Sequence, residues 1–280
     1  MKKAILVVSF GTTYEDTRKK TIDVVEEKIR KSFPEYEVRR AFTAHQIISR
    51  LKERDNVYVD TPEEALKKLM DENYEEVIVQ PLHIIPGSEY DYIRSVVSHF
   101  RHKKFFKKLS IGRPALYFKG GDGVPDDYVI FVDAVKEHLD KEQNFLLMGH
   151  GSVHSSNACY SCLQHVFQDE GFNNVYIGNV EGYPELNIIM DKLVKEGVKD
   201  VTLKPLMLVS GDHANNDMVG NDEDSWQNQL AGVGISSQAD MRSLGEIGAF
   251  QNIYVQHVED AISGAYDKVG ASKKVNRILT

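Results

Sequence analysis

Two histidines and one glutamate, His150, Glu181 and His213, each come directly after an apolar run typical of a buried strand. Open α/β sheets bind ligands at the carboxyl ends of their parallel strands, so we expect these side chains at one edge of a sheet. Imidazole and carboxylate groups suit a divalent ion such as Co²⁺, Ni²⁺, Fe²⁺ or Zn²⁺. Imidazole also accepts protons near neutral pH, because its ordinary pKa is about 6.5. The alternative is that each side chain only caps loop amides, but three such residues at equivalent strand ends favour a functional site.

Alternating strands and helices are expected to position these residues. The strands are apolar on both faces, which is typical of a buried parallel sheet, and the alternation predicts an α/β fold with doubly wound sheets. The predicted strands are 4–9, 36–42, 76–82, 109–116, 144–148, 174–179, 201–209 and an edge strand at 235–242. The predicted helices are 14–33, 45–54, one starting at 61, one ending near 102, 126–139, 157–170, 184–196 and 250–266, with an irregular polar segment at 215–224.

Two pieces of sequence recur in the two halves of the chain. Residues 9–12 match 149–152 at an offset of 140, and residues 76–82 match 200–206 at an offset of 124. A duplication predicts two similar lobes with a cleft between their strand ends. We assign 1–125 to an N-terminal lobe, 126–270 to a C-terminal lobe that carries the histidines, and 271–280 to a tail. The last helix is a candidate to pack back on the first lobe.

The repeat also pairs residues of the first lobe with the candidate site. Phe10 falls on His150, and Glu89 falls on His213. We therefore expect Phe10 and Glu89 to contact a ligand from the other side of the cleft, together with Gly11 and Gly151, whose turns allow close backbone approach. The alternative for Glu89 is a carboxylate that stabilises the start of a helix.

Composition excludes several classes of protein. The 280 residues are 41% hydrophobic and carry a net charge of −8, which argues against a general nucleic-acid binder. The sequence contains no apolar run of about 20 residues, so no membrane span is predicted. The apolar run at 4–8 is too short for a signal peptide, so we expect a cytoplasmic protein. The two cysteines of the chain, Cys159 and Cys162, do not form a disulfide framework. We interpret them as packing residues, rather than as a redox pair or a zinc site.

Several motifs, in order and at similar spacing, resemble those of the CbiK-type anaerobic sirohydrochlorin cobaltochelatases, which are class II chelatases. The motifs are Val7–Thr12, Pro81–Gly87, Gly149–Ser152, Asn179–Pro184 and Ser210–Asp217. The resemblance covers the chain to about Tyr266 and implies two α/β lobes with a tetrapyrrole cleft between them. It implies insertion of Co²⁺ into sirohydrochlorin during cobalamin synthesis without ATP, with His150, Glu181 and His213 as metal ligands. The absence of a phosphate-binding Gly-x-x-x-x-Gly-Lys-Ser/Thr loop agrees with this.

The residues fit such a reaction, because a metal entering a tetrapyrrole displaces two pyrrole protons and His150 or His213 can accept them. Two competing functions stay open, namely insertion of Fe²⁺ or Ni²⁺, and a carrier of tetrapyrrole or metal without turnover. The oligomeric state, a homo-oligomer included, and the oxidation state of the macrocycle are also open. Five basic residues are candidates to bind substrate carboxylates, namely Arg50, Arg94, Arg101, Lys103 and Lys204.

Overall fold

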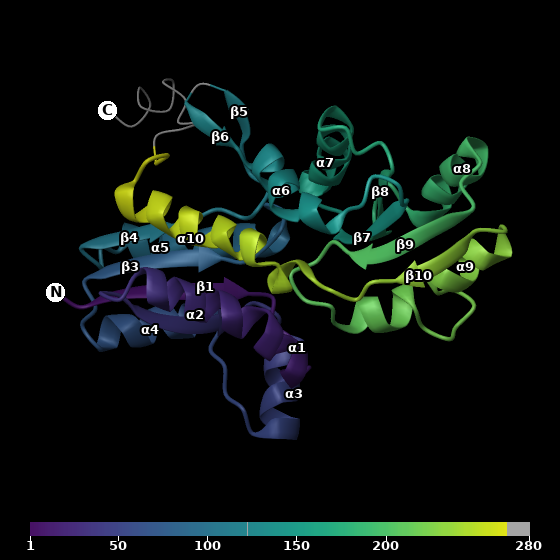
Figure 1. The fold of residues 1–280 in the computed structure, drawn as a ribbon. Coiled ribbons are helices and arrows are strands. Elements are labelled where there is room, and N and C mark those ends of the chain that lie inside the picture. Colours follow the sequence, from purple (N-terminus) through teal and green to yellow (C-terminus); the bar gives the residue numbers. More distant parts are fainter. Residues whose placement is uncertain (122, 268–280) are drawn as a thin grey trace.

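The chain forms two lobes that lie side by side, each built on a four-stranded parallel sheet (Figure 1). The structure is a computed structural model that describes residues 1–121 and 123–267. The prediction of an α/β fold with two similar lobes is confirmed. The predicted tail, 271–280, lies outside the described residues.

The first lobe contains nine main elements in chain order. They are β1 (Lys3–Ser9), α1 (Glu15–Lys20), α2 (Ile22–Ser32), β2 (Glu37–Phe42), α3 (His45–Asp55), α4 (Pro62–Asp71), β3 (Glu76–Pro81), α5 (Ser88–His102) and β4 (Lys108–Ile111). A small antiparallel pair, β5 (Lys119–Gly121) and β6 (Val124–Asp126), follows before the second lobe.

The second lobe repeats the alternation of strands and helices. Its elements are α6 (Asp127–Val135), η1 (Lys136–His138), β7 (Phe145–Gly151), η2 (Ser155–Asn157), α7 (Ala158–Asp169), β8 (Val175–Glu181), α8 (Leu186–Glu196), β9 (Asp200–Pro205), the π-helix η3 (Ala214–Met218), α9 (Trp226–Gly232), β10 (Ser236–Ala239), η4 (Leu244–Glu246) and α10 (Gly248–Ser263). No helix in the described ranges is long and apolar enough to cross a membrane.

The two sheets share one topology and one register. The strand order is β2-β1-β3-β4 in the first lobe and β8-β7-β9-β10 in the second. Val8 on β1 lies opposite Pro81 on β3, and Met148 on β7 lies opposite Pro205 on β9. These equivalent pairs carry the offsets of 140 and 124 that the sequence repeat predicts. The structure therefore confirms the internal repeat, and α3 accounts for the longer spacing in the first lobe.

Each sheet is covered on both faces, because alternate residues of its strands point to opposite sides. On β1, Ile5 and Val7 face one apolar cluster, while Leu6 and Val8 face another that α4 and α5 complete. In the second lobe, α8 and α9 cover the outer face. The cluster that contains Ile5 continues into the second lobe, so the lobes share one core.

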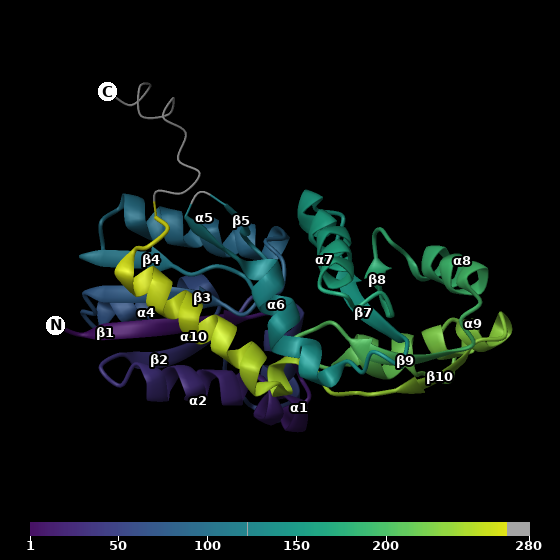
Figure 2. The ribbon, with the colours of Figure 1, turned by 45° about the horizontal axis from the view of Figure 1, so that its top comes forward.

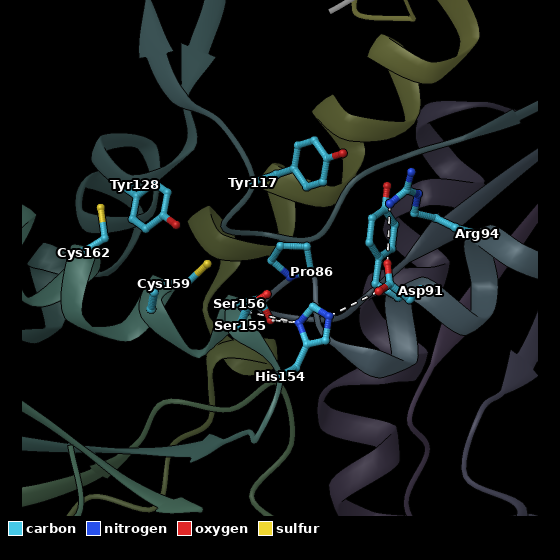
Figure 3. Close-up of a pocket in the computed structure, with 12 residues that line it drawn as sticks. Pro86, Asp91, Arg94, Tyr117, Tyr128, His154, Ser155, Ser156, Cys159 and Cys162 are labelled. Atoms are coloured by element: carbon cyan, nitrogen blue, oxygen red, sulfur yellow. Dashed lines mark hydrogen bonds and ion pairs between the residues drawn. The ribbon is translucent and has the colours of Figure 1, made fainter. Parts of the chain in front are cut away.

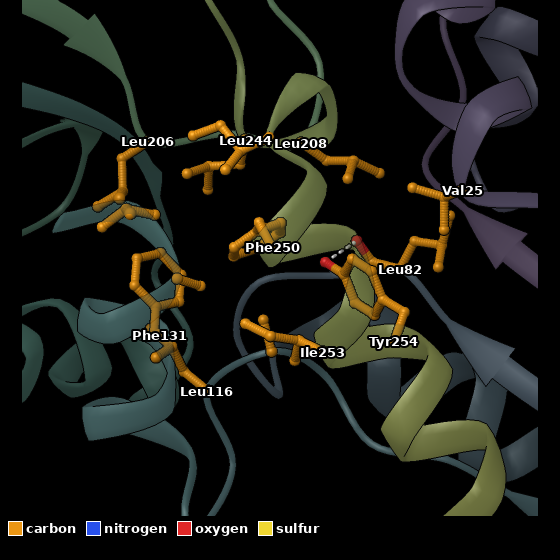
Figure 4. Close-up of a cluster of buried hydrophobic side chains, with 14 of the residues drawn as sticks. Val25, Leu82, Leu116, Phe131, Leu206, Leu208, Leu244, Phe250, Ile253 and Tyr254 are labelled. Carbon is orange, nitrogen blue, oxygen red and sulfur yellow. Dashed lines mark hydrogen bonds between the residues drawn. The ribbon is translucent and has the colours of Figure 1, made fainter. Parts of the chain in front are cut away.

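The last helix joins the two lobes. In the turned view α10 runs along the first sheet, and α6 lies at the junction (Figure 2); α10 packs against α2, α6 and β3. Side chains from both lobes meet at this junction, where Phe250 of α10 lies between Leu206 and Leu82 (Figure 4). The hydroxyl of Tyr254 donates to the carbonyl of Leu82 over 2.9 Å. This packing stabilises the contact between α10 and the first lobe.

A buried charged network lies beside this junction. Arg113 binds Asp127 of α6 at 2.9 Å and Asp260 of α10 at 2.6 Å. His257 hydrogen-bonds the carbonyl of Arg113 through Nδ1 over 2.9 Å. Because both side chains of the Arg113–Asp127 pair are almost completely buried, removing Arg113 leaves the buried Asp127 carboxylate without its guanidinium partner.

Four details of the predicted elements are wrong. The strand predicted at 201–209 ends at Pro205, because the carbonyls of Met207 and Leu208 accept hydrogen bonds from the amides of 244 and 245 instead of from a strand. The helix predicted at 14–33 is interrupted at Thr21, whose hydroxyl donates to the carbonyl of Thr17 over 2.7 Å. The strand predicted at 109–116 ends at Ile111, because the amides of 115 and 116 bond the loop after β3 instead of a strand. The segment predicted as irregular at 215–224 contains most of the π-helix η3, which the polar composition concealed.

Candidate functional site

His150 lies at the carboxyl end of β7 and is half-buried. Its Nδ1 lies 3.0 Å from the carbonyl oxygen of Gly151, the next residue. Gly151 has φ +77°, and a Cβ there would lie 1.5 Å from the carbonyl oxygen of Glu181. Only glycine therefore fits this turn, which sets the direction in which His150 leaves the sheet.

His213 follows β9 and forms the N-cap of the π-helix η3. Its ring lies edge-to-face against that of His150, with the centroids 4.8 Å apart and the planes at 89°. Its Nδ1 lies 2.5 Å from a carboxylate oxygen of Asp217. The structure thus brings together the two histidines that come from the ends of neighbouring strands.

Glu181 is the last residue of β8 and lies opposite Gly151 in the sheet. Its side chain is exposed. In the described part of the chain, no group of three or more His, Cys, Asp or Glu side chains is arranged to hold a metal ion. Glu181 is therefore next to the turn that carries His150, but the three-ligand metal set remains a prediction.

The turn after β1 in the first lobe lies close to the loop that carries His213. The hydroxyl of Tyr14 donates to Asp212 across the lobes over 3.1 Å. Phe10 in this turn is 48% exposed, and Gly11 has φ +94°, the same left-handed region as its counterpart Gly151. The repeat therefore places an aromatic residue on the turn equivalent to that of His150, and its contact with a ligand remains a prediction.

Glu89 lies in the first turn of α5 and is half-buried. Burial and Glu63 of α4 raise the pKa of Tyr92, with a smaller contribution from Glu89. The carboxylate of Glu89 is thus near the α4 side of its helix, and its place in the first turn fits the helix-stabilising alternative. A role opposite His213 stays a prediction.

A pocket of about 550 Å³ lies between the lobes on the side of α5 and α7 (Figure 3). His154 points across it toward Asp91, with Nε2 3.3 Å from the carboxylate. The lining includes Arg94, Cys159 and Cys162 but neither His150 nor His213. Burial raises the pKa of both thiols, which makes them poor nucleophiles and agrees with a packing role.

Two of the basic residues considered for substrate carboxylates are already engaged. Lys204 is buried and pairs with Asp240, and Arg101 donates twice to the carbonyl of Leu109, at 2.8 and 3.1 Å.

Sequence reasoning missed two contacts of the site, namely the one between Asp217 and His213 and the one between Tyr14 and Asp212. The four-residue spacing from His213 to Asp217 is the one signal that predicts such a pair.

Comparison with solved structures defines the class of the fold. SirB from Bacillus subtilis with Fe³⁺ matches with a TM-score of 0.64 at 14% identity, over 96% of this chain and 98% of that one. CbiX, described as the terminal enzyme of siroheme biosynthesis in denitrifying bacteria, matches with a TM-score of 0.53 at 15% identity, over 92% and 99%. These likenesses show the fold alone, which this chain shares with SirB and CbiX.

Sequence comparison defines the family. The family model described as cobalt chelatase (CbiK) matches residues 3–263. The sirohydrochlorin cobaltochelatase of Salmonella typhimurium is 40% identical over 271 residues, which are 96% of this chain and 99% of that protein. Sirohydrochlorin cobaltochelatase CbiKC of Nitratidesulfovibrio vulgaris is 33% identical over 274 residues, 95% of this chain and 93% of that protein. The chain belongs to the CbiK cobalt chelatase family.

Proposed function

We propose that this chain inserts Co²⁺ into sirohydrochlorin, or into its reduced precursor, as a step of anaerobic cobalamin synthesis in the cytoplasm. The observation that carries the proposal is the pair His150 and His213, whose rings meet at 4.8 Å at the carboxyl edge of the second sheet. Membership of the CbiK family and the names of two relatives, both sirohydrochlorin cobaltochelatases, support the same substrate and metal.

The reaction exchanges protons for a metal ion. Co²⁺ forms bonds to the ring nitrogens of the macrocycle, two pyrrole N–H bonds break, and two protons leave. An imidazole whose Nδ1–H is held by an acceptor keeps its lone pair on Nε2. In the described residues the hydrogen bonds of both His150 and His213 involve Nδ1, so each ring has Nε2 available as base or ligand. Glu181, on the neighbouring strand end, is the proposed third ligand.

The macrocycle is proposed to lie between the two strand-end edges, with the imidazoles on one side and the turn of Phe10 on the other. The contact between Tyr14 and Asp212 supports this placement, because it brings these two edges within hydrogen-bonding distance. A half-exposed aromatic ring can stack on a tetrapyrrole. No nucleotide is needed in this proposal, since the metal–nitrogen bonds replace the broken N–H bonds.

The test is multiple-turnover metallation followed by absorbance, with sirohydrochlorin in excess over protein and a blank without protein. A chelatase consumes many equivalents, whereas a carrier stops at one. Parallel reactions with Co²⁺, Fe²⁺ and Ni²⁺ identify the preferred metal, since these ligands discriminate weakly among the three.

Variants test the site itself. We expect His213→Ala and His150→Ala each to lower the rate by about 100-fold or more, within the range of general acid–base catalysis. His165→Ala, an exposed histidine on α7, is the control and should react at the wild-type rate. Near-normal turnover by His213→Ala would refute the assignment of base and ligand.

A further inference from the structure

Asp217 contacts His213, one of the two edge-to-face histidines, and has no role in the chemistry described above. Its carboxylate lies 2.5 Å from Nδ1 of His213. We propose that Asp217 is a positioning residue that holds His213 in the Nδ1–H tautomer and fixes its ring against His150. This inference rests on the proposed function, because it assigns a supporting residue to the same site.

The hydrogen bond determines which nitrogen of the ring is free. An ionised carboxylate only accepts hydrogen bonds, so Nδ1 must carry the proton and Nε2 keeps its lone pair. His150 reaches the same state by a different route, because its Nδ1 faces the carbonyl oxygen of Gly151. Both rings therefore present Nε2. Histidines that bind metals are commonly oriented by a carboxylate or carbonyl on the other ring nitrogen.

The contact is one of three side-chain hydrogen bonds along the same turn that share a spacing of four residues. Asn215 donates to the carbonyl of Gly211 at 2.8 Å, and Asn216 donates to the carboxylate of Asp212 at 3.0 Å. Each side chain thus bonds the residue four positions earlier. Position 217, whose partner four residues earlier is His213, carries a carboxylate, whereas positions 215 and 216 carry amides. An amide at 217 would offer both a donor and an acceptor and would not select one tautomer.

The backbone holds this turn in place. Ala214 and Met218 on either side of the polar residues are completely buried in the outer core of the second lobe. The amide of Gly220 bonds the carbonyl of Asn216 over 3.0 Å. The π-helix therefore anchors its apolar residues in the core, and Asp217 is carried by a fixed turn. π-turns of this kind are frequent at functional sites.

The first measurement reads the tautomer directly in the metal-free protein. Long-range ¹H–¹⁵N spectra of the imidazole rings are recorded at about pH 8, where a histidine of ordinary pKa is neutral. The signals of His213 are identified by their loss in His213→Ala. We expect Nδ1–H in the wild-type protein and a shift toward the Nε2–H form, which a solvated histidine prefers, in Asp217→Ala.

The second measurement is titration with Co²⁺ alone, followed by the visible absorption of the bound ion. We expect Asp217→Ala to bind Co²⁺ 10- to 100-fold more weakly, the usual loss when a residue that orients a ligand is removed. Asp224→Ala, an exposed acid of the same segment, is the control for charge and should bind like the wild type. If the alanine variant does not fold, Asp217→Asn takes its place, with the same expected direction.

The outcomes separate the two proposals. An unchanged tautomer in Asp217→Ala, or a changed tautomer with unchanged Co²⁺ affinity, overturns the role of Asp217. Normal metallation by His213→Ala overturns the proposed site instead, and the spectra still report whether Asp217 sets the tautomer.

Discussion

Replacing Gly151 by alanine should distort the junction of β7 and β8 at the candidate site. Alanine in the left-handed region costs about 1–2 kcal/mol, and Gly151 has φ +77°. The new Cβ would also lie 1.5 Å from the carbonyl oxygen of Glu181. This contact is with backbone, so one strand end must move, and overpacking of this kind costs about 1–3 kcal/mol. Gly151→Ala should therefore lower the free energy of unfolding by about 2–5 kcal/mol, summing these two contributions.

Gly197→Ala separates the two contributions. Gly197 caps α8 with φ +75°, and a Cβ there would meet no atom within 4 Å. Only the backbone cost of about 1–2 kcal/mol should appear in this variant. Urea unfolding followed by circular dichroism measures both free energies. Equal losses in the two variants would show that the strand ends accommodate the Cβ freely and would refute the reasoning.

The same substitution has a consequence for the proposed reaction. His150 and Glu181 flank the position where the strand ends must separate. We expect folded Gly151→Ala protein to bind Co²⁺ more weakly than the wild type, whereas Gly197→Ala should bind it normally. Normal Co²⁺ binding by Gly151→Ala would show that the spacing of β7 and β8 does not control the site.

Three further substitutions test residues outside the histidine pair. Phe10→Ala should change stability by no more than about 0.5 kcal/mol, because the side chain is half-exposed, and should raise KM for sirohydrochlorin; an unchanged KM argues against contact with the ring. Glu89→Gln should cost about 0.3–1 kcal/mol of stability at normal rate if the carboxylate only stabilises α5, and should lower the metallation rate if it faces the macrocycle. Burial alone would raise the pKa of Asp127, but the imidazole of His257, whose Nε2 lies 3.6 Å away, and the hydrogen bonds from Arg113 hold it below its usual value. The resulting stabilisation is present at pH 7 and is lost as the pH falls through the folded-state pKa. Asp127→Asn should therefore destabilise the protein at pH 7, by less than the roughly 3–5 kcal/mol of a buried charge left without any partner, because Asp260 still pairs with Arg113. It should also flatten the acid side of a plot of urea midpoint against pH; an unchanged slope contradicts this.

Features that depend on local pattern and topology could be predicted from the sequence. Apolar runs located the inner strands of both sheets, β1, β3, β7 and β9, and His150 and His213 were expected to lie together because parallel strands end at the same edge of a sheet. The break at Thr21 was missed because the apolar stripe continues past it, and tertiary packing decides where the helix is interrupted. The contact between Tyr14 and Asp212 joins residues 198 positions apart, and no periodicity reports such a pair.

The π-helix shows a different limit of sequence reasoning. Residues 215–217 are polar, which is typical of a loop, and their composition gives no helical stripe. The turn forms because the residues on either side of them, Ala214 and Met218, are buried in the core, so two buried anchors outweigh the local preference. The contact between His213 and Asp217 follows from this turn, so a sequence interpretation that makes 215–217 irregular does not predict it.

The internal repeat predicts that the two faces of the bound macrocycle meet different chemical groups. Equivalent turns follow β1 and β7, and both place a glycine with positive φ directly after the residue of interest. The scaffold is therefore the same, but Phe10 has no lone pair where His150 has one. Among the positions that the repeat pairs with the two imidazoles, Glu89 alone can accept a proton from the first lobe. If Glu89→Gln leaves the metallation rate unchanged, proton removal and metal entry must both use the imidazole face. If it lowers the rate without lowering stability, the two processes are divided between the faces.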